Sequence, residues 1–122
     1  MDAKEVLAEA RRSKLRVAAL MERRAWYERA QQCCSGGRSE AMAKLQRALD
    51  REIDEVVRQE LAAMGQIDAL ADPIHREVLR YRYLNGWEWK EIARRMGYSP
   101  DWIKHMHSDA IRAVEMLKNN EA

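Results

Sequence analysis

Hydrophobic residues recur at intervals of three and four along most of this chain, which is the spacing of one face of an α-helix. The clearest seam is predicted to lie on one helix and comprises Leu45, Leu49, Ile53, Val56, Val57, Leu61 and Met64. Ile67 and Leu70 continue it, so we expect this helix to end near Leu70. Residues 2–32 contain no Gly or Pro and carry a weaker stripe, made of Val6, Ala10, Val17, Leu20 and Met21. Two antiparallel helices are therefore predicted, joined by the break at residues 33–38, whose Gly pair is typical of a turn.

Local end signals mark further helices along the chain. Ser39 is a good N-cap for the second helix. Asp72-Pro73 begins a third, because Asp caps well and Pro suits the first helical position. Asn85-Gly86 ends it, since both residues tolerate a positive φ. A helical hairpin alone has a thin core, so it must pack on the C-terminal part of the chain or on another copy of itself.

The stretch from residue 87 to residue 108 holds three of the four tryptophans and two of the three histidines around one tight break. A short helix is predicted from Trp89, a left-handed turn at Gly97, and a new helix from Ser99-Pro100. The stripe of this last helix comprises Ile103, Met106, Ala110, Val114 and Leu117. The triplet Ala93, Gly97 and Ile103 fits the DNA-binding helix-turn-helix, whose second helix enters the major groove, although many helix pairs with a Gly turn imitate it.

These patterns predict an all-α protein in two parts. Residues 1–71 form a long helical hairpin of the coiled-coil kind, for oligomerisation or contact with a partner. Residues 72–122 form a three-helix helix-turn-helix domain for DNA binding. The net charge of the chain is only +2, and residues 72–122 contribute +1. A strongly basic footprint is missing, so the prediction of DNA binding depends on the pattern of residues.

The composition also indicates the cellular compartment in which the protein acts. No run approaches the roughly 18 to 20 apolar residues that span a membrane. The first 21 residues interrupt their apolar positions with charge, unlike a signal peptide. Cys33 and Cys34 are adjacent, a spacing poorly suited to a structural disulfide, and we interpret them as reduced thiols. We therefore expect a cytoplasmic protein with no membrane partner.

The C-terminal half carries a recognisable set of short motifs, namely Arg82-Tyr83, Trp89, Glu91-Ile92-Ala93, Tyr98-Ser99, His107 and Ala110-Ile111. With these motifs it resembles region four of bacterial sigma factors. It is similar also to a family of small phage and prophage proteins that carry a helix-turn-helix of this kind. The resemblance is strong over residues 73–114 and vague elsewhere. It implies a sigma-region-four-like domain and a transcriptional regulator of the phage late-gene activator kind.

The resemblance also implies which residues contact DNA. The base-facing set would be Ser99, Pro100, Asp101, Lys104, His105 and Ser108. Pro100 cannot donate a hydrogen bond and departs from the sigma pattern, while Lys104 and His105 can donate to base acceptors and Asp101 can accept from cytosine. The set lacks a bidentate Arg or Gln, which indicates modest base specificity or a shifted register. Phosphate contacts are expected from the residues that flank the groove-facing surface, namely Lys90, Arg94, Arg95 and Arg112.

Other chemistries find little support in the sequence. Trp87 and Trp89 are interpreted as core anchors. Trp102 lies off the apolar stripe, and a partner surface, a contact to a thymine methyl group and packing on the hairpin all remain open for it. His105 and His107 are two residues apart and point to different sides of a helix, so no metal or other cofactor is expected. Without a catalytic cluster, the protein is not expected to be an enzyme.

Two classes of function remain. In the first, the protein is a DNA-binding regulator of phage or prophage origin, with double-stranded DNA as its partner. Its hairpin would then supply a homodimer interface or a contact to RNA polymerase. In the second, the helix-turn-helix is only a scaffold for protein interaction, as in a polymerase-binding factor or a DNA-packaging adaptor. The first class is the favoured one, while the low charge of residues 72–122 is an argument for the second.

Overall fold

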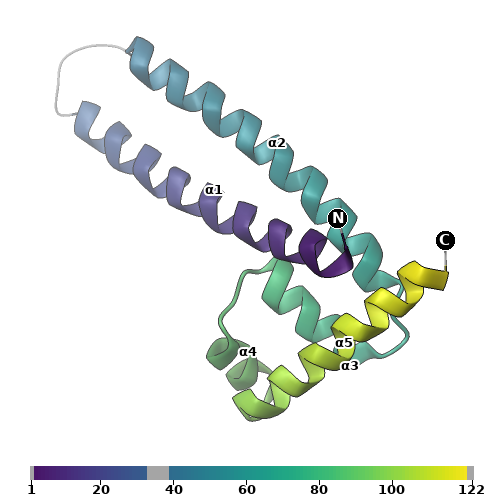
Figure 1. Cartoon of the computed structure of the whole chain (residues 1–122). Helices are drawn as coiled ribbons and strands as arrows, with labels where there is room; N and C mark the ends of the chain where they lie inside the picture. The colour runs from purple at the N-terminus through teal and green to yellow at the C-terminus, as the bar shows by residue number, and fades with distance from the viewer. Residues whose placement is uncertain (1, 33–38, 121–122) are drawn as a thin grey trace.

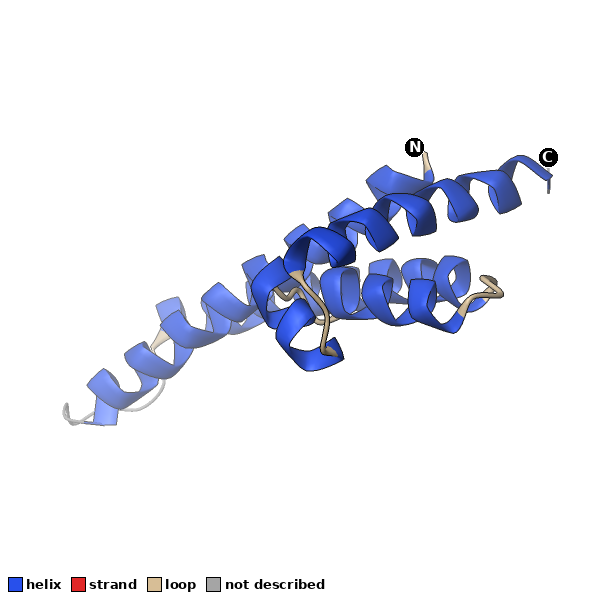
Figure 2. Cartoon of the chain, turned by 90° about the horizontal axis from the view of Figure 1, so that it is seen from below, coloured by secondary structure: helices blue, strands red, loops and turns tan. Residues whose placement is uncertain are grey.

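The computed structural model describes residues 2–32 and 39–120, and all of the regular secondary structure in these ranges is helical. Two long helices, α1 (Ala3–Gln32) and α2 (Glu40–Asp68), lie side by side as a hairpin, and its outer half projects away from the rest of the chain (Figure 1). The C-terminal part gathers at the base of the hairpin (Figures 1 and 2). Its elements are α3 (Pro73–Leu79), the π-helical turn η1 (Arg80–Leu84), α4 (Trp89–Met96) and α5 (Pro100–Asn120). The prediction of a long helix pair followed by a helix-turn-helix is confirmed.

The ends of the helices follow the local signals in the sequence. Ser39 Oγ accepts a hydrogen bond from the Met42 backbone N–H at 3.1 Å, and Asp72 Oδ1 accepts one from Ile74 N–H at 2.8 Å. Gly86 and Gly97 both have a positive φ, at 77° and 78°. Helix α2 ends at Asp68, two residues before the expected end, while Cys33 and Cys34 lie outside the described residues.

The predicted seam of α2 was partly wrong, because only one edge of it is covered. Met42, Leu49, Val56 and Ala63 recur every seven residues and are buried. The other edge, made of Val57, Leu61 and Met64, is exposed, with Leu61 at 62%. The two stripes lie next to each other on the helix surface, and α1 is too narrow to cover both. We call the exposed stripe, residues 57, 61 and 64, the outer stripe of α2.

The stripe of α1 was also shifted from the prediction. Ala10 and Val17 are buried as expected, but Met21 is exposed and Val6 and Leu20 are only half-buried. Three positions that the sequence pattern did not predict complete the buried face, namely Ala3, Leu7 and Ser13. Together with Ala10 and Val17 they recur along the helix at intervals of three and four. Two ion pairs, Lys14 with Glu60 and Arg16 with Glu52, both at 3.0 Å, join the helices.

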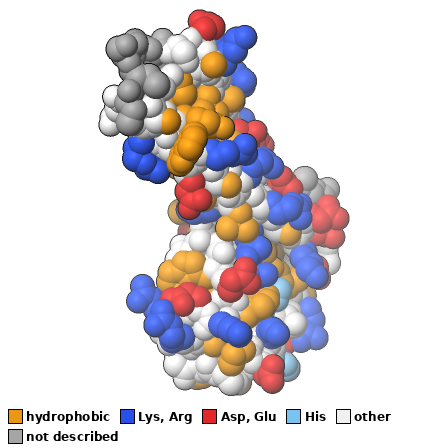
Figure 3. All heavy atoms as spheres, turned by 90° about the vertical axis from the view of Figure 1, so that its left-hand side faces the viewer, with side chains coloured by type: hydrophobic (Ala, Val, Ile, Leu, Met, Phe, Trp, Pro, Cys, Tyr) orange, Lys and Arg blue, Asp and Glu red, His pale blue; other side chains and the backbone are white. Residues whose placement is uncertain are grey.

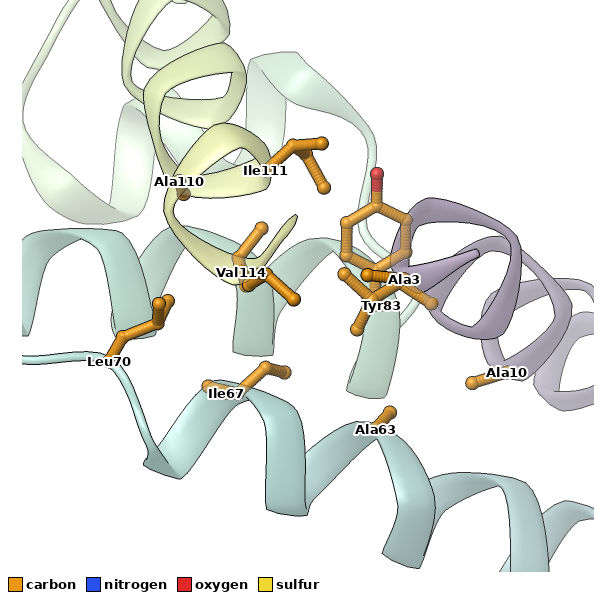
Figure 4. Packing of buried hydrophobic residues seen from close by; sticks show 11 residues of the cluster. Ala3, Ala10, Ala63, Ile67, Leu70, Tyr83, Ala110, Ile111 and Val114 are labelled. Carbon is orange, nitrogen blue, oxygen red and sulfur yellow. The ribbon is translucent and has the colours of Figure 1, made fainter. Parts of the chain in front are cut away.

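The hairpin packs on the C-terminal part of its own chain through one shared core. The cluster draws residues from five elements and the α2–α3 connection, and the buried members are Ala3, Leu7, Ala10, Ala63, Ile67, Leu70, Leu79, Tyr83, Ala110, Ile111 and Val114. Figure 4 shows Ala3 beside Tyr83, with Ile111 and Val114 of α5 facing the same space. The small residues Ala3, Ala10 and Ala63 allow close approach of the helix backbones. The sequence left open what the base of the hairpin packs on, and the structure shows that it is the C-terminal part of the chain.

A second cluster lies inside the C-terminal part and holds the helix-turn-helix together. Its buried members are Val78, Ile92, Ala93 and Ile103. The π-helical turn, which the sequence pattern did not predict, lies between the two clusters. Tyr83 of this turn belongs to the shared core, whereas Tyr81 packs on the second cluster and stacks on Trp87 at 4.7 Å. Trp87 and Trp89 are half-buried against this second cluster, in agreement with their interpretation as anchors.

Candidate nucleic-acid interface

The turn between α4 and α5 is built on the predicted triplet. Ala93 and Ile103 are buried against each other's helices, and the Ala93 carbonyl accepts backbone hydrogen bonds from Gly97 at 2.9 Å and Tyr98 at 3.0 Å. The left-handed Gly97 closes α4, and the Ser99 carbonyl then accepts the first backbone bond of α5, from Ile103 N–H. A larger residue than Ala93 would push α5 away from α4, so this small side chain sets the spacing of the two helices.

The apolar side of α5 is buried while its polar flank faces solvent. Ile103, Ala110 and Val114 point into the two clusters. All six predicted base-facing residues are exposed, namely Ser99, Pro100, Asp101, Lys104, His105 and Ser108. Two of these side chains already make bonds within the helix. Ser99 Oγ accepts from Trp102 N–H at 3.2 Å, and Ser108 Oγ–H donates to the Lys104 carbonyl at 3.2 Å.

Asp109, an acidic residue that was not among the predicted site residues, lies at the edge of this flank. Asp109 is half-buried and lies between two basic side chains, with His105 Nε2 at 3.6 Å and Arg112 in a short ion pair on the other side. Its position four residues after His105 and three before Arg112 is the signal that could have revealed it, because such pairs face each other on a helix. Asp109 therefore lies beside one predicted base contact and pairs with one predicted phosphate contact.

The four predicted phosphate contacts are all exposed but differ in their surroundings. Arg94 pairs with Glu91 at 2.7 Å, and the Arg95 guanidinium lies 5.3 Å from the centre of the Trp87 ring. Arg112 pairs with Asp109. Three of the four lie on α4 and one on α5, so the basic side chains are spread over both helices of the motif rather than forming one dense patch.

Trp102 is half-buried at the start of α5. Its ring stacks on Tyr98 with centroids 3.9 Å apart and packs against the second cluster. Trp102 thus packs within the helix-turn-helix and not on the described part of the hairpin.

Behind the polar flank, a group of polar and aromatic residues joins α5 to η1 and α4. The Tyr83 hydroxyl and His107 Nε2 share a hydrogen bond of 2.5 Å, and the Trp89 ring meets the His107 ring edge-on at 4.8 Å. The Arg82 guanidinium lies 4.2 Å from the centre of the Trp89 ring and donates to the Trp87 carbonyl. Burial, with the positive charges of Arg82 and Lys4, lowers the pKa of His107 from 6.5 to about 4. His107 is therefore neutral at pH 7.

This depressed pKa predicts a loss of stability in mild acid. Between pH 6.5 and pH 4 the unfolded chain binds a proton at His107 that the folded chain rejects, so folding stability falls as the pH falls. We expect roughly 1–2 kcal/mol less stability at pH 5 than at pH 7 from this residue, allowing for partial exposure of the ring. Urea unfolding of the wild type and of His107→Gln, at both pH values, measures it. Equal pH dependence in the two proteins would contradict the assignment.

Comparison with known proteins identifies the class of domain that this geometry represents. Residues 71–115 match the family model described as Sigma-70, region 4. The C-terminal part of the chain is therefore a sigma-region-four-like helix-turn-helix, a DNA-binding class of domain, as the resemblance implied. The match spans α3, η1 and α4 and ends within α5, leaving the hairpin outside it. Searches among curated proteins and among solved structures found no match.

Two further findings concern the described residues. Within residues 2–32 and 39–120, no three His, Cys, Asp or Glu side chains come together in a way that could hold a metal ion. None of the helices in these ranges is both long enough and apolar enough to cross a membrane.

Proposed function

We propose that the protein is a DNA-binding transcription regulator of phage or prophage origin, acting in the bacterial cytoplasm, with α5 entering the major groove from Pro100 onward. The observation that carries this proposal is the exposed polar flank of α5 in a sigma-region-four-like domain. In this fold class the second helix of the motif presents its first turns to base edges. Nothing in the described chain covers Lys104 or His105, which remain exposed.

Base reading would come from a small set of polar side chains. Lys104 and His105 would donate to acceptors such as guanine O6 and N7, and Asp101 would accept from a cytosine amino group. Ser99 and Pro100, at the start of the helix, would contribute shape complementarity to the groove rather than strong hydrogen bonds to bases. Because Ser108 already donates to the Lys104 carbonyl, it keeps mainly its acceptor capacity for DNA. The set predicts measurable but modest sequence preference.

The experiment that tests the proposal is a binding titration across a range of salt concentrations. Fluorescently labelled duplexes that tile the genome near the protein's own gene would be compared with unrelated duplexes of equal length. We expect one region to bind more tightly, with an affinity that falls steeply as salt rises because phosphate contacts release counterions. Uniform binding of all duplexes, or none, would overturn the proposal.

We further propose that the protein forms a homodimer through the hairpin. The outer stripe of α2 leaves three large apolar side chains in water, at intervals of four and three that suit packing against another helix. A two-fold dimer would place two copies of α5 on half-sites about one helical turn apart. Such an arrangement would offset the modest affinity expected of a single domain.

Sedimentation of a charged variant tests the dimer. Leu61→Glu places a carboxylate in the middle of the outer stripe and should convert the dimer to monomer at micromolar concentration, because a buried unpaired charge is costly. Lys44→Glu, at an exposed position on the same helix, should leave the dimer intact. A wild type that sediments only as monomer would instead make the hairpin an intramolecular brace.

The second candidate function, a protein-interaction module, is favoured by aromatic residues on the outer half of the hairpin. Trp26 is 60% exposed and meets Tyr27 edge-on at 5.2 Å. Hydrophobic side chains gather on the hairpin part of the surface seen in Figure 3, whereas acidic and basic side chains are mixed over the C-terminal part. Aromatic residues are enriched at protein interfaces. RNA polymerase binding or a DNA-packaging adaptor role would then need Trp26 but not Lys104, the reverse of the DNA-binding hypothesis.

A further inference from the structure

We infer that Lys4, in the hairpin, binds a phosphate of the same DNA duplex, so that the hairpin forms part of the DNA-binding surface. A surface pocket of about 230 Å³ lies where the first turn of α1 meets α5, lined by Lys4, His107, Ser108, Ile111 and Arg112. The start of α1 and the end of α5 lie on the same side of the molecule in both cartoon views (Figures 1 and 2). This inference rests on the proposed function, because it needs DNA to lie against α5.

The position of Lys4 is fixed by its neighbours along α1. Ala3 and Leu7 on either side of it are buried in the shared core, at 1% and 0% exposure. The Asp2 carboxylate caps the helix by accepting from the Glu5 N–H at 2.8 Å. One turn beyond Leu7, Arg11 donates to the Gly86 carbonyl and pairs with Glu88 at 3.1 Å. The backbone beneath Lys4 is therefore held against the C-terminal part at both ends of its helical turn.

The charge of Lys4 is available to an anion. Among the described residues, no carboxylate lies within ion-pair distance of its ammonium group, whereas most arginines of the C-terminal part have an acidic partner. Arg112, the other cation of the pocket, shares its charge with Asp109. Ser108 also lines the pocket, but its hydroxyl already donates to the Lys104 carbonyl. The two cations at this shallow pocket suit a phosphate group, which accepts charge-assisted hydrogen bonds from both.

The pocket also lies beside residues of α5 that are predicted to contact DNA. Ser108 belongs to the predicted base-facing set, and Arg112, one turn further along, belongs to the predicted phosphate set. A phosphate beside both residues would be at the edge of the groove that α5 occupies. Lys4 would extend the row of backbone contacts across the junction onto α1, a contribution that the C-terminal part cannot supply alone.

The test compares the salt dependence of DNA affinity for Lys4→Ala with that of Lys44→Ala. Both variants lose one lysine charge from an exposed helical site, but Lys44 lies on the outer half of the hairpin. Each phosphate contact contributes about 0.9 to the slope of log affinity against log salt concentration. We expect Lys4→Ala to lower the slope by about one and Lys44→Ala to leave it unchanged. The double variant Lys4→Ala/Arg112→Ala should lower it by about two, and Lys4→Arg should restore it.

The outcomes separate this inference from the proposed function. A wild type that fails to bind DNA overturns both. A wild type with normal salt dependence, together with equal slopes for the Lys4 and Lys44 variants, overturns the role of Lys4 and leaves the proposed function standing. A titration with inorganic phosphate is a further test. If phosphate shifts the amide NMR signals of Ser108 and Ile111 to saturation, but Lys4→Ala leaves the salt dependence of DNA affinity unchanged, the pocket binds free anions and the inference fails.

Discussion

Replacing Lys104 and His105 together by alanine is expected to abolish the preference of the protein for one duplex over another. Both side chains are exposed on the flank of α5 that would face base edges. A good contact between a side chain and a base contributes about 1–3 kcal/mol of discrimination. The ratio of specific to non-specific affinity should therefore fall by about tenfold or more, as measured by titration against the preferred and an unrelated duplex. Folding stability should change little, since alanine favours helix.

Arg94→Ala provides the matched comparison. Arg94 lies on α4 and is predicted to contact phosphate, so its loss should weaken binding to all duplexes alike and leave the preference intact. The two variants thus separate base reading from positioning. If Lys104→Ala/His105→Ala retained the full preference, the contacts to bases would have to come from elsewhere, and the sigma-like register of α5 would be wrong.

Leu7→Ala is expected to lower the stability of the whole chain by about 3 kcal/mol. Leu7 is fully buried in the shared core, and removing a leucine side chain from such a site leaves a cavity and costs about 2–5 kcal/mol. Because this core joins the hairpin to the C-terminal part, both should lose stability together. Met116→Ala, at an exposed apolar site on α5, should change stability by less than about 0.5 kcal/mol.

The measurement can follow the two parts separately. In a Trp26→Phe background, the remaining tryptophans lie in the C-terminal part, so their fluorescence reports on that part during urea unfolding. Circular dichroism at the same time reports mainly on the long hairpin helices. We expect Leu7→Ala to shift both transitions equally. A shift in helicity without a shift in tryptophan fluorescence would show that the two parts unfold independently.

Much of the fold could be predicted because its signals are local. Ser39 and Asp72 cap helices through their own side chains, and Gly86 and Gly97 adopt the left-handed conformation that ends a helix. Each of these features depends on a few neighbouring residues, so the sequence alone reveals it. The division of α5 into a buried stripe and a polar flank follows in the same way from the helical period.

The features that the sequence did not reveal depend on tertiary packing. Leu61 and Val56 lie on adjacent stripes of α2, and which stripe is covered is decided by the width and position of α1. Lys4 resembles any other lysine on a helix until the packing of Ala3 and Leu7 brings it beside α5. Asp109 was visible as part of a spacing pattern, but its importance depends on which side of α5 faces outward.

The shared core also fixes the direction in which the hairpin points. Its base packs on η1 and α5, while its outer half projects well beyond the C-terminal part (Figure 1). On a duplex held by α5, the outer half of the hairpin would therefore always point in the same angular direction around the DNA axis. Any contact that it makes would depend on helical phase: moving the binding site by about five base pairs, half a turn of B-DNA, would carry the outer half to the opposite side of the duplex.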